Sequence, residues 1–212
     1  MKILVVCGGD RSKHQIALNC IKHLIKEKRD SFYFCIEDRN EQILKFLIKK
    51  KLNYKVSDVK SFLENIDNNE YDWLLNIWGT KIFTKRVLHK FKDNLNIHPS
   101  YLPFARGRDP YVWAIQNNLP VGITIHRMSD QVDFGQYYVR KKLNLNFPFT
   151  AGDIFDGCLQ LSMKVFIKKW KEIRSKKIRP KKFINIKKKI YKRKDLINSN
   201  FLNLNKKKIK NI

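Results

Sequence analysis

The sequence alternates between short apolar runs and longer stretches with helical periodicity, and this alternation constrains the fold most strongly. Residues 3–7 and 72–78 are mostly apolar, which is typical of strands covered on both faces. Between such runs, apolar residues recur about one helical turn apart, as Ile16, Cys20 and Leu24 do, which indicates amphipathic helices. The pattern predicts an α/β fold with an open, mostly parallel, twisted sheet and helices on both faces.

The order of the expected elements defines one domain and a tail. Gly8 and Gly9 follow the first strand as a turn, but they do not complete the G-x-G-x-x-G pattern of dinucleotide-binding sites. Lysine runs replace the periodicity from about residue 175, so we expect a domain over residues 1–175 and a short basic C-terminal extension over residues 176–212. The expected strands cover residues 3–7, 31–36, 54–56, 72–78, 94–98, 121–126 and 136–145. The expected helices cover 12–28, 40–50, a stretch capped by Ser57 or Ser61 that runs to 66, 82–92, a stretch from 110, and a stretch from 150 or 153 to 174.

The chain carries a formal net charge of +26, which raises the question of a nucleic-acid partner. Residues 164–212 hold 20 of the 45 Lys and Arg residues and only 2 of the 19 Asp and Glu residues. Most of these cations are lysines in a chain rich in Asn and Ile, a bias that an A/T-rich genome also produces. Lysine is less suited than arginine to bidentate phosphate recognition. Nucleic-acid binding through the tail therefore stays open but is not favoured.

The sequence contains neither a membrane span nor a cysteine-based site. No stretch reaches the roughly 18 uninterrupted apolar residues of a spanning helix, and the N-terminal apolar run is too short for a signal peptide. We therefore expect a cytoplasmic protein without a membrane partner. The cysteines form no C-x-x-C pair, and we interpret them as small buried hydrophobic residues, with no metal site; they are Cys7, Cys20, Cys35 and Cys158.

Asn96 and His98 form the first part of a candidate site. They lie two apart on an expected strand, so their side chains project to the same face, and Pro99 then ends the strand. Asp133 follows on a later polar loop beside Gly135. An amide can donate to a developing oxyanion, a histidine can move a proton near neutral pH, and a carboxylate can orient that histidine. No nucleophile accompanies them, so the trio suits acyl transfer between two bound substrates, although a lone histidine is more often structural.

These residues and their surroundings resemble the folate-dependent formyltransferase family, most closely its sugar N-formyltransferases. The resemblance spans roughly residues 70–165 and implies the Rossmann-like formyltransferase fold. Its first and most specific block is N-x-H-P-S-x-L-P-x-x-R-G. The complete set is Asn96-x-His98-Pro99-Ser100-x-Leu102-Pro103-x-x-Arg106-Gly107, Pro110-x-x-Trp113-Ala114-Ile115, Gly122-x-Thr124-x-His126 and Asp133-x-Gly135.

The resemblance implies roles for these residues and a cosubstrate, 10-formyltetrahydrofolate. A substrate amine attacks the formyl carbon, Asn96 and His98 stabilise the oxyanion, and Asp133, through a water, helps the amine proton reach the departing folate nitrogen. The family binds its pterin between the loop that follows the strand preceding N-x-H and the loop that holds the aspartate. The cofactor-binding candidates here are Trp78, Gly79, Thr80, Ile82, Gln131 and Val132.

The resemblance also suggests the amine. The run R-G-R-x-P-Y-x-W-A-I is most like the sugar branch, which implies a nucleotide-linked amino sugar such as a dTDP-4-amino-4,6-dideoxyhexose and a role in O-antigen or other glycan biosynthesis. Methionyl-tRNA and glycinamide ribonucleotide formyltransferases are the alternatives, and a non-catalytic RNA-binding derivative is a more distant one. A homodimer stays open. Arg106 could equally pin its loop, and aromatic residues on a helix, such as Tyr111 and Trp113, more often belong to the core. A histidine at the place of His126 is slightly more often structural. The substrate-binding candidates are Arg106, Gly107, Arg108, Tyr111 and Trp113.

Overall fold

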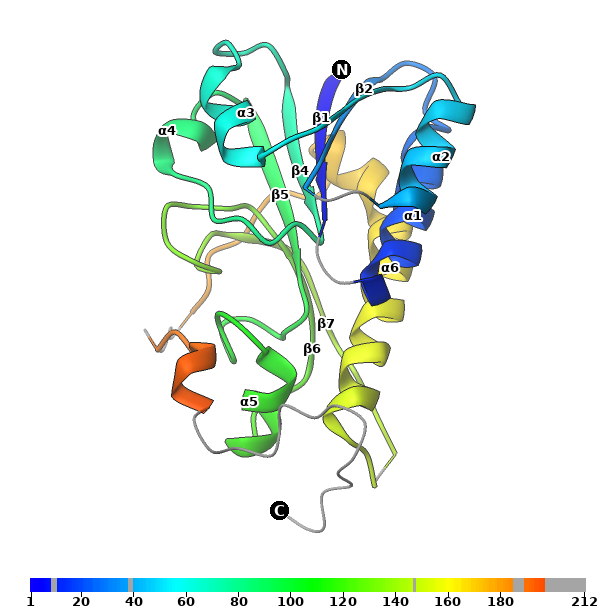
Figure 1. Ribbon diagram of the computed structural model, residues 1–212. Helices are drawn as coiled ribbons and strands as arrows, with labels where there is room; N and C mark the ends of the chain where they lie inside the picture. The colour runs from blue at the N-terminus through cyan, green and yellow to red at the C-terminus, as the bar shows by residue number, and fades with distance from the viewer. Residues whose placement is uncertain (9–10, 38–39, 147, 185–188, 197–212) are drawn as a thin grey trace. The chain divides into compact units, whose positions relative to one another are not determined.

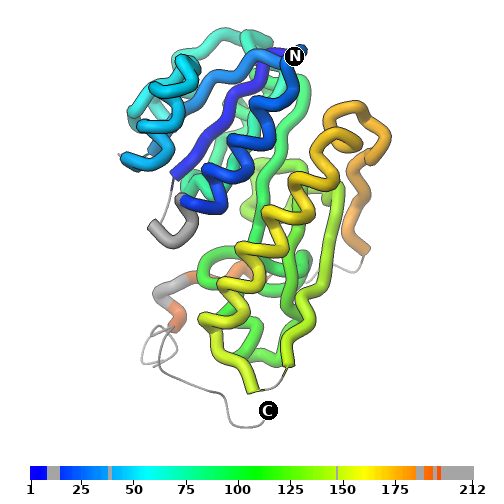
Figure 2. The backbone as a smooth tube through the Cα atoms, turned by 90° about the vertical axis from the view of Figure 1, so that its right-hand side faces the viewer, coloured from blue at the N-terminus to red at the C-terminus, as the bar shows by residue number. Residues whose placement is uncertain are grey.

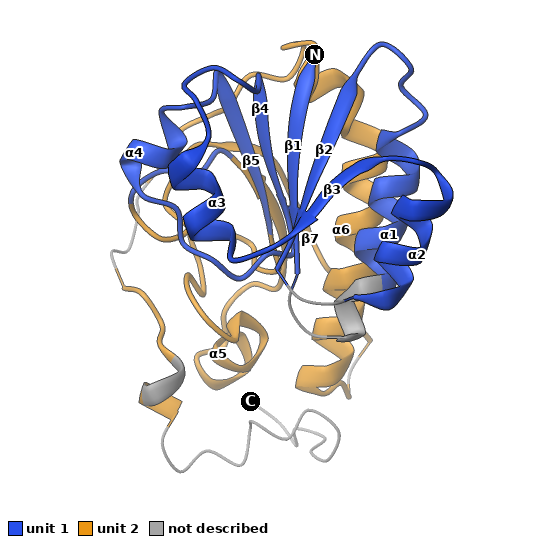
Figure 3. Ribbon diagram, turned by 45° about the horizontal axis from the view of Figure 1, so that its top comes forward, with its two compact units in different colours: residues 1–97, 127–130 blue, residues 98–126, 131–212 orange. Residues whose placement is uncertain are grey.

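The structure is a computed structural model that describes residues 1–8, 11–37, 40–146, 148–184 and 189–196 (Figure 1). The chain divides into two compact units (Figure 3). The first comprises residues 1–97 and 127–130, and the second comprises residues 98–126 and 131–212. The domain boundary expected at residue 175 stays a prediction.

The first unit is built on parallel strands with helices on both faces. Helices α1 and α2 cover one face of its strands, and α3 and α4 cover the other (Figures 1 and 3). The strand order is β3-β2-β1-β4-β5, so the chain adds β2 and β3 on one side of β1 and then β4 and β5 on the other side. Ligands of such sheets bind at the carboxyl ends of the strands where the order reverses, here β1 and β4. The strands are β1 (Lys2–Cys7), β2 (Ser31–Ile36), β3 (Asn53–Val56), β4 (Trp73–Ile77) and β5 (Asp93–His98), and the helices are α1 (Arg11–Leu24), α2 (Glu41–Lys49), α3 (Val59–Asn65) and α4 (Lys85–Leu88).

Side-chain caps decide where several helices of this unit begin. Asn40 accepts a hydrogen bond from the Ile43 backbone and caps α2, so the helix expected from residue 40 begins at Glu41. Asp58, rather than Ser57 or Ser61, caps α3 through the Ser61 backbone N–H. The helix expected over residues 82–92 is only Lys85–Leu88, because Thr84 caps it late and the chain must leave the helix before β5 begins at Asp93.

The first unit has buried cores on both faces of its sheet, one of them against helices α3 and α4. Strands β1 and β4 are buried along almost their whole length, as expected for strands covered on both faces. Burial raises the pKa of the Cys20 thiol to about 12, which makes it unreactive. The four cysteines are free and buried, as predicted. The core cluster on the α3 and α4 side consists of Leu4, Val6, Cys35, Val59, Leu63, Ile66, Tyr71, Leu74, Phe83, Val87, Leu88 and Phe91.

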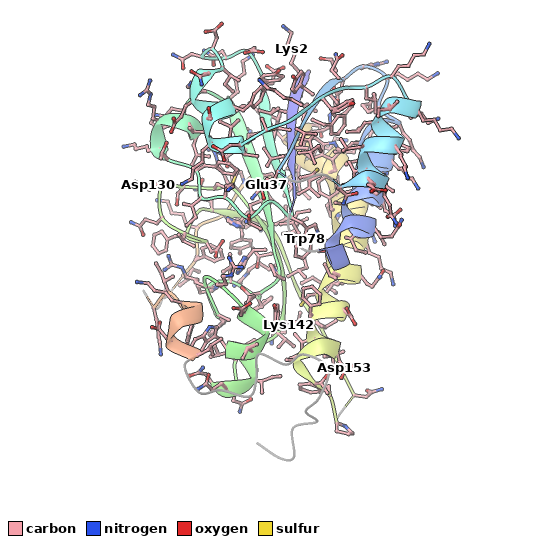
Figure 4. The ribbon with its side chains drawn as sticks, in the orientation of Figure 1. Lys2, Glu37, Trp78, Asp130, Lys142 and Asp153 are labelled. Carbon is pink, nitrogen blue, oxygen red and sulfur yellow. The ribbon has the colours of Figure 1, made fainter. Side chains whose placement is uncertain are left out.

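The second unit joins an antiparallel strand pair to one long helix. Its elements are α5 (Pro110–Gln116), β6 (Gly122–His126), β7 (Tyr137–Lys142), α6 (Ala151–Arg174) and a short 3₁₀-helix, η1 (Arg193–Leu196). Thr150 and Asp153, the latter labelled in Figure 4, form a reciprocal capping box that starts α6. Helix α6 packs on β6. The complete sheet has seven strands in the order β3-β2-β1-β4-β5-β6-β7 and is mostly parallel, as the sequence predicts.

Part of the expected basic extension packs on the second unit. After α6 the chain turns back (Figure 2), and Lys181 pairs with Tyr137 through backbone hydrogen bonds of 2.9 and 2.8 Å. Phe183 and Leu196 are buried. The strand expected over residues 136–145 ends at Lys142. The sequence also predicts that the tail frays beyond Asn198, and those residues lie outside the described part of the chain. None of the described helices is long and apolar enough to cross a membrane.

Lys90 provides a test of the packing around α3. Its ammonium is buried and donates to the carbonyls of Leu63, Glu64 and Ile66 at 3.1, 2.7 and 2.7 Å, which closes the C-terminal end of that helix. Lys90→Met keeps the apolar stem but leaves these carbonyls without their charged donor. We expect the free energy of unfolding to fall by about 2–3 kcal/mol in urea denaturation.

Lys92→Met is the matched control. Lys92 forms an exposed ion pair of 2.6 Å with Asp72, and its side chain is 67% exposed. Exposed pairs contribute about 1 kcal/mol or less, so this variant should unfold close to wild type. Equal losses in the two variants would contradict the capping role of Lys90.

Candidate active site

Two asparagines on neighbouring strands set the direction of the Asn96 amide. Asn76 on β4 lies opposite Asn96 on β5 in the parallel register. Its Nδ2 donates to Asn96 Oδ1 at 3.0 Å and to the Gly79 carbonyl at 3.3 Å. A backbone carbonyl only accepts, so the Asn76 NH₂ group must face it, and the same group then selects the Asn96 oxygen. The Asn96 NH₂ group is thereby directed away from β4 as a donor.

The loop after β4 is held by a carboxylate from β2. Glu37, which follows β2 directly, accepts from the Thr80 backbone N–H at 3.1 Å and from the Thr80 hydroxyl at 2.9 Å. Trp78, labelled with Glu37 in Figure 4, is buried and has a left-handed backbone with φ of 63°. Strained backbone of this kind is enriched at ligand sites. Ile82 in the same loop is 60% exposed, an unusual position for a large apolar side chain.

In the second unit, one carboxylate lies between two buried histidines. Asp133 Oδ1 is 3.4 Å from His98 Nδ1 and 3.7 Å from His126 Nε2. His98 is 7% exposed and His126 is 1% exposed. The Nε2 atom of His98 is buried, and no hydrogen-bond partner for it is found among the described residues. A histidine that has a carboxylate near one ring nitrogen and no partner on the other can bind a substrate group through the second nitrogen.

Residues of the loop after β5 hold Asp133 and its neighbours in place. The Gly107 backbone N–H donates to Asp133 Oδ2 at 3.0 Å. The buried Arg106 guanidinium donates to the Val132 carbonyl at 2.7 Å and lies 4.6 Å from the Phe134 ring. Burial lowers the pKa of Arg106, and the Asp133 charge opposes this shift. Asp133 itself has φ of 48°, so fixed contacts hold its left-handed backbone.

The predicted substrate-binding residues divide into two groups. Arg106 is 2% exposed and bonds within the loop, which is the pinning role that the sequence left open. Trp113 is buried against Tyr191 with ring centroids 4.7 Å apart, and Tyr111 packs edge-on against Phe155. Both aromatic residues therefore contribute to packing. Arg108 is exposed and Gly107 carries the Asp133 contact.

The predicted cofactor-binding residues fall on two loops. Trp78, Gly79, Thr80 and Ile82 lie after β4 in the first unit, whereas Gln131 and Val132 lie in the second unit. Gln131 is exposed, and the Val132 carbonyl accepts from Arg106. The described residues contain no group of three or more His, Cys, Asp and Glu side chains that could hold a metal ion.

Sequence reasoning missed Asn76 and Glu37 as supports of the site. Both lie at the carboxyl end of an expected strand, and a polar residue there was the available signal. Tyr191 of the basic extension is a third residue that sequence reasoning did not place at this loop. Nothing in the sequence pairs it with Gly107, because the two positions are far apart along the chain.

Thr124 tests how the loop after β5 is fixed. Its buried hydroxyl donates to the Ser100 carbonyl at 2.7 Å and accepts from the Leu102 N–H at 3.0 Å. Thr124→Val conserves the volume but leaves two backbone groups unsatisfied, each at a cost of about 1–3 kcal/mol. We expect a loss of about 2 kcal/mol or more in urea denaturation. Thr124→Ser keeps the hydroxyl and should lose about 1 kcal/mol for the methyl group. A valine variant as stable as the serine variant would contradict this role.

Comparison with known proteins gives the chain its family. The formyl transferase family profile matches residues 21–169. Methionyl-tRNA formyltransferase from Mycoplasma capricolum is 31% identical over 173 residues, which cover 75% of this chain and 53% of that protein. The chain thus spans about half the length of the curated relatives it matches.

Solved structures share the fold. A 4-N formyltransferase from Francisella tularensis has a TM-score of 0.78 at 22% identity, covering 93% of this chain and 78% of that one. The formyltransferase PseJ from Anoxybacillus kamchatkensis has a TM-score of 0.67 at 23% identity, covering 93% and 88%. The family profile spans well over half of the 212 residues. The chain therefore belongs to the formyl transferase family.

Proposed function

We propose that the protein is an N-formyltransferase that moves a formyl group from 10-formyltetrahydrofolate to the amine of a nucleotide-linked amino sugar. The observation that carries the proposal is the buried His98 Nε2, which no described residue satisfies, on a ring whose Nδ1 lies 3.4 Å from Asp133. Such a nitrogen suits a carbonyl oxygen that gains negative charge.

The proposed reaction uses Asn96 and His98 as donors and Asp133 as the proton-handling group. The amine nitrogen bonds to the formyl carbon, and the carbonyl electrons move onto oxygen. Asn96 Nδ2 donates to this oxygen, and so does His98 Nε2 in the imidazolium form, which carries a proton on both ring nitrogens. The bond from that carbon to N10 of the folate then breaks, and the proton lost by the amine ends on N10. Asp133 assists this transfer through a water. Each oxyanion donor contributes about 3 kcal/mol in comparable enzymes.

The folate is proposed to bind against the loop after β4 and against Gln131 and Val132. Glu37 already uses the backbone N–H and hydroxyl of Thr80, so Thr80 offers mainly its carbonyl and methyl groups. The exposed Ile82 supplies apolar surface of the kind that a pterin or aminobenzoyl ring covers.

An amino sugar is the amine that we favour. The Anoxybacillus protein was solved with UDP-4,6-dideoxy-4-formamido-L-AltNAc and tetrahydrofolate. Arg108 is exposed and follows Gly107, whose N–H donates to Asp133. It is the remaining candidate to bind a pyrophosphate. The loop after β5 carries the R-G-R run that resembles the sugar branch.

Methionyl-tRNA is the second candidate, since the 31% identical relative acts on it by name. Glycinamide ribonucleotide is less favoured, because the Glu37 side chain fills the space at Gly8, where an added Cβ would lie 2.6 Å from Oε2. The Glu37 carboxylate at this turn would repel the phosphate group of the ribonucleotide. The RNA-binding alternative rests on a tail that lies largely outside the described residues.

The direct test follows folate release by absorbance with a panel of amines. Purified protein is mixed with 10-formyltetrahydrofolate and dTDP- or UDP-amino sugars, methionyl-tRNA or glycinamide ribonucleotide. We expect release with one nucleotide sugar, and a loss of about 10²- to 10⁴-fold in His98→Asn and Asp133→Asn. Release with methionyl-tRNA alone would move the assignment to that branch. Binding of folate without release on any amine would contradict the proposed activity.

Asn76 gives a second, independent test. Asn76→Ala removes the group that fixes the Asn96 amide, so we expect kcat to fall about tenfold while KM for both substrates stays within about twofold. Asn65→Ala is the matched control, since the Asn65 amide donates to the Ser61 carbonyl at the exposed end of α3. A fall in Asn76→Ala that appears wholly in KM would show that Asn76 acts on binding instead.

A further inference from the structure

Tyr191 lies across the loop that supports Asp133. Its backbone N–H donates to the Arg106 carbonyl at 2.8 Å, and its carbonyl accepts from the Arg108 N–H at 3.0 Å. These two bonds make a parallel β-bridge between Tyr191 and Gly107. The Tyr191 ring packs on Trp113, and the residue is 9% exposed. One tail residue thus holds both neighbours of Gly107.

Gly107 is required for this close approach. Its φ is 100°, a conformation that side-chain-bearing residues rarely adopt. A Cβ at this position would lie 2.3 Å from the Tyr191 carbonyl oxygen and 3.2 Å from the Tyr191 nitrogen. The loop and the tail are therefore matched to each other at backbone level, which chance packing of a surface tail does not require.

The bridge leads directly to the carboxylate. Gly107 donates its own N–H to Asp133 Oδ2, and Asp133 Oδ1 is 3.4 Å from His98 Nδ1. The bridge fixes the peptide units on both sides of Gly107, so it fixes the direction of that N–H. Loss of the bridge frees the N–H to turn away, and Asp133 then loses one of its holding contacts.

We propose that Tyr191 is a positioning residue for the active site, because its backbone bridge to the Arg106–Arg108 loop sets the Gly107 N–H that holds Asp133 beside His98. The inference rests on the proposed formyl transfer for its kinetic consequence, but its structural consequence is independent of any substrate. The tail segment around Tyr191 then supports the site through backbone contacts alone.

The alternative is that Tyr191 only adds stability by covering Trp113. The positioning role requires the Tyr191 backbone N–H, whereas the covering role requires only the ring. Tyr191→Pro removes the donor to the Arg106 carbonyl and disturbs the bridge. Tyr191→Ala is the matched control, since it removes the ring from Trp113 but keeps the backbone N–H and carbonyl that form the bridge.

The test uses the full chain and two readouts. The first is the imidazole Cε1–H resonance of His98, assigned with His98→Asn in NMR spectra without substrate. We expect this resonance to shift in Tyr191→Pro and to stay in place in Tyr191→Ala, whereas a shift in both variants would favour the covering role of the ring. The second is formyl transfer, where kcat should fall about tenfold or more in the proline variant with KM changed by less than about twofold.

Gly107→Ala applies the same disturbance from the other side and serves if the proline variant folds poorly in urea denaturation. An unshifted His98 resonance in a folded Tyr191→Pro or Gly107→Ala protein would overturn the proposal. A shifted resonance with no formyl transfer in the wild-type protein would instead contradict the proposed function and leave the positioning role in place.

Discussion

The hold on the Asp133 carboxylate is the interaction on which the second unit's site depends. One oxygen accepts the Gly107 N–H at 3.0 Å, and the other lies between His98 and His126 at 3.4 and 3.7 Å. A carboxylate that is largely removed from water, as the 12% exposed Asp133 side chain is, costs free energy unless donors surround it. Each contact here comes from a different segment of the unit, so the fold as a whole, rather than any local motif, fixes where this charge sits.

Support for the site comes mainly from backbone groups in unusual conformations. Left-handed residues occur at Ala105, Gly107 and Asp109 in the loop after β5, and at Asp133 itself. Non-glycine residues in this region cost of order 1 kcal/mol each and persist only where neighbours over-determine them. The neighbours are identifiable, since Thr124 holds the start of the loop and Tyr191 holds its end. Rigid loops of this kind suit a reaction that needs donors aimed in advance.

The sequence predicts the element order and the location of the site well, because both follow from local patterns. Continuous apolar runs marked β1 and β4, and the polar pair Asn96 and His98 marked the end of β5. It predicts the supports poorly. Asn76 faces Asn96 only through strand register, Arg106 is used internally because its loop folds over it, and Tyr191 reaches Gly107 across the tail. Such pairings depend on tertiary contacts that no periodicity encodes.

The proposed role of His98 is tested most directly by the ¹⁵N resonance of its Nε2 when 5-formyltetrahydrofolate is titrated into the protein. We expect a saturable shift of this nitrogen, because the formyl oxygen is proposed to bind on the side of the ring that no described residue satisfies. The exposed His89 provides an internal reference that should not move. Saturable folate binding with an unmoved His98 Nε2 would contradict the assignment of this histidine to the formyl group.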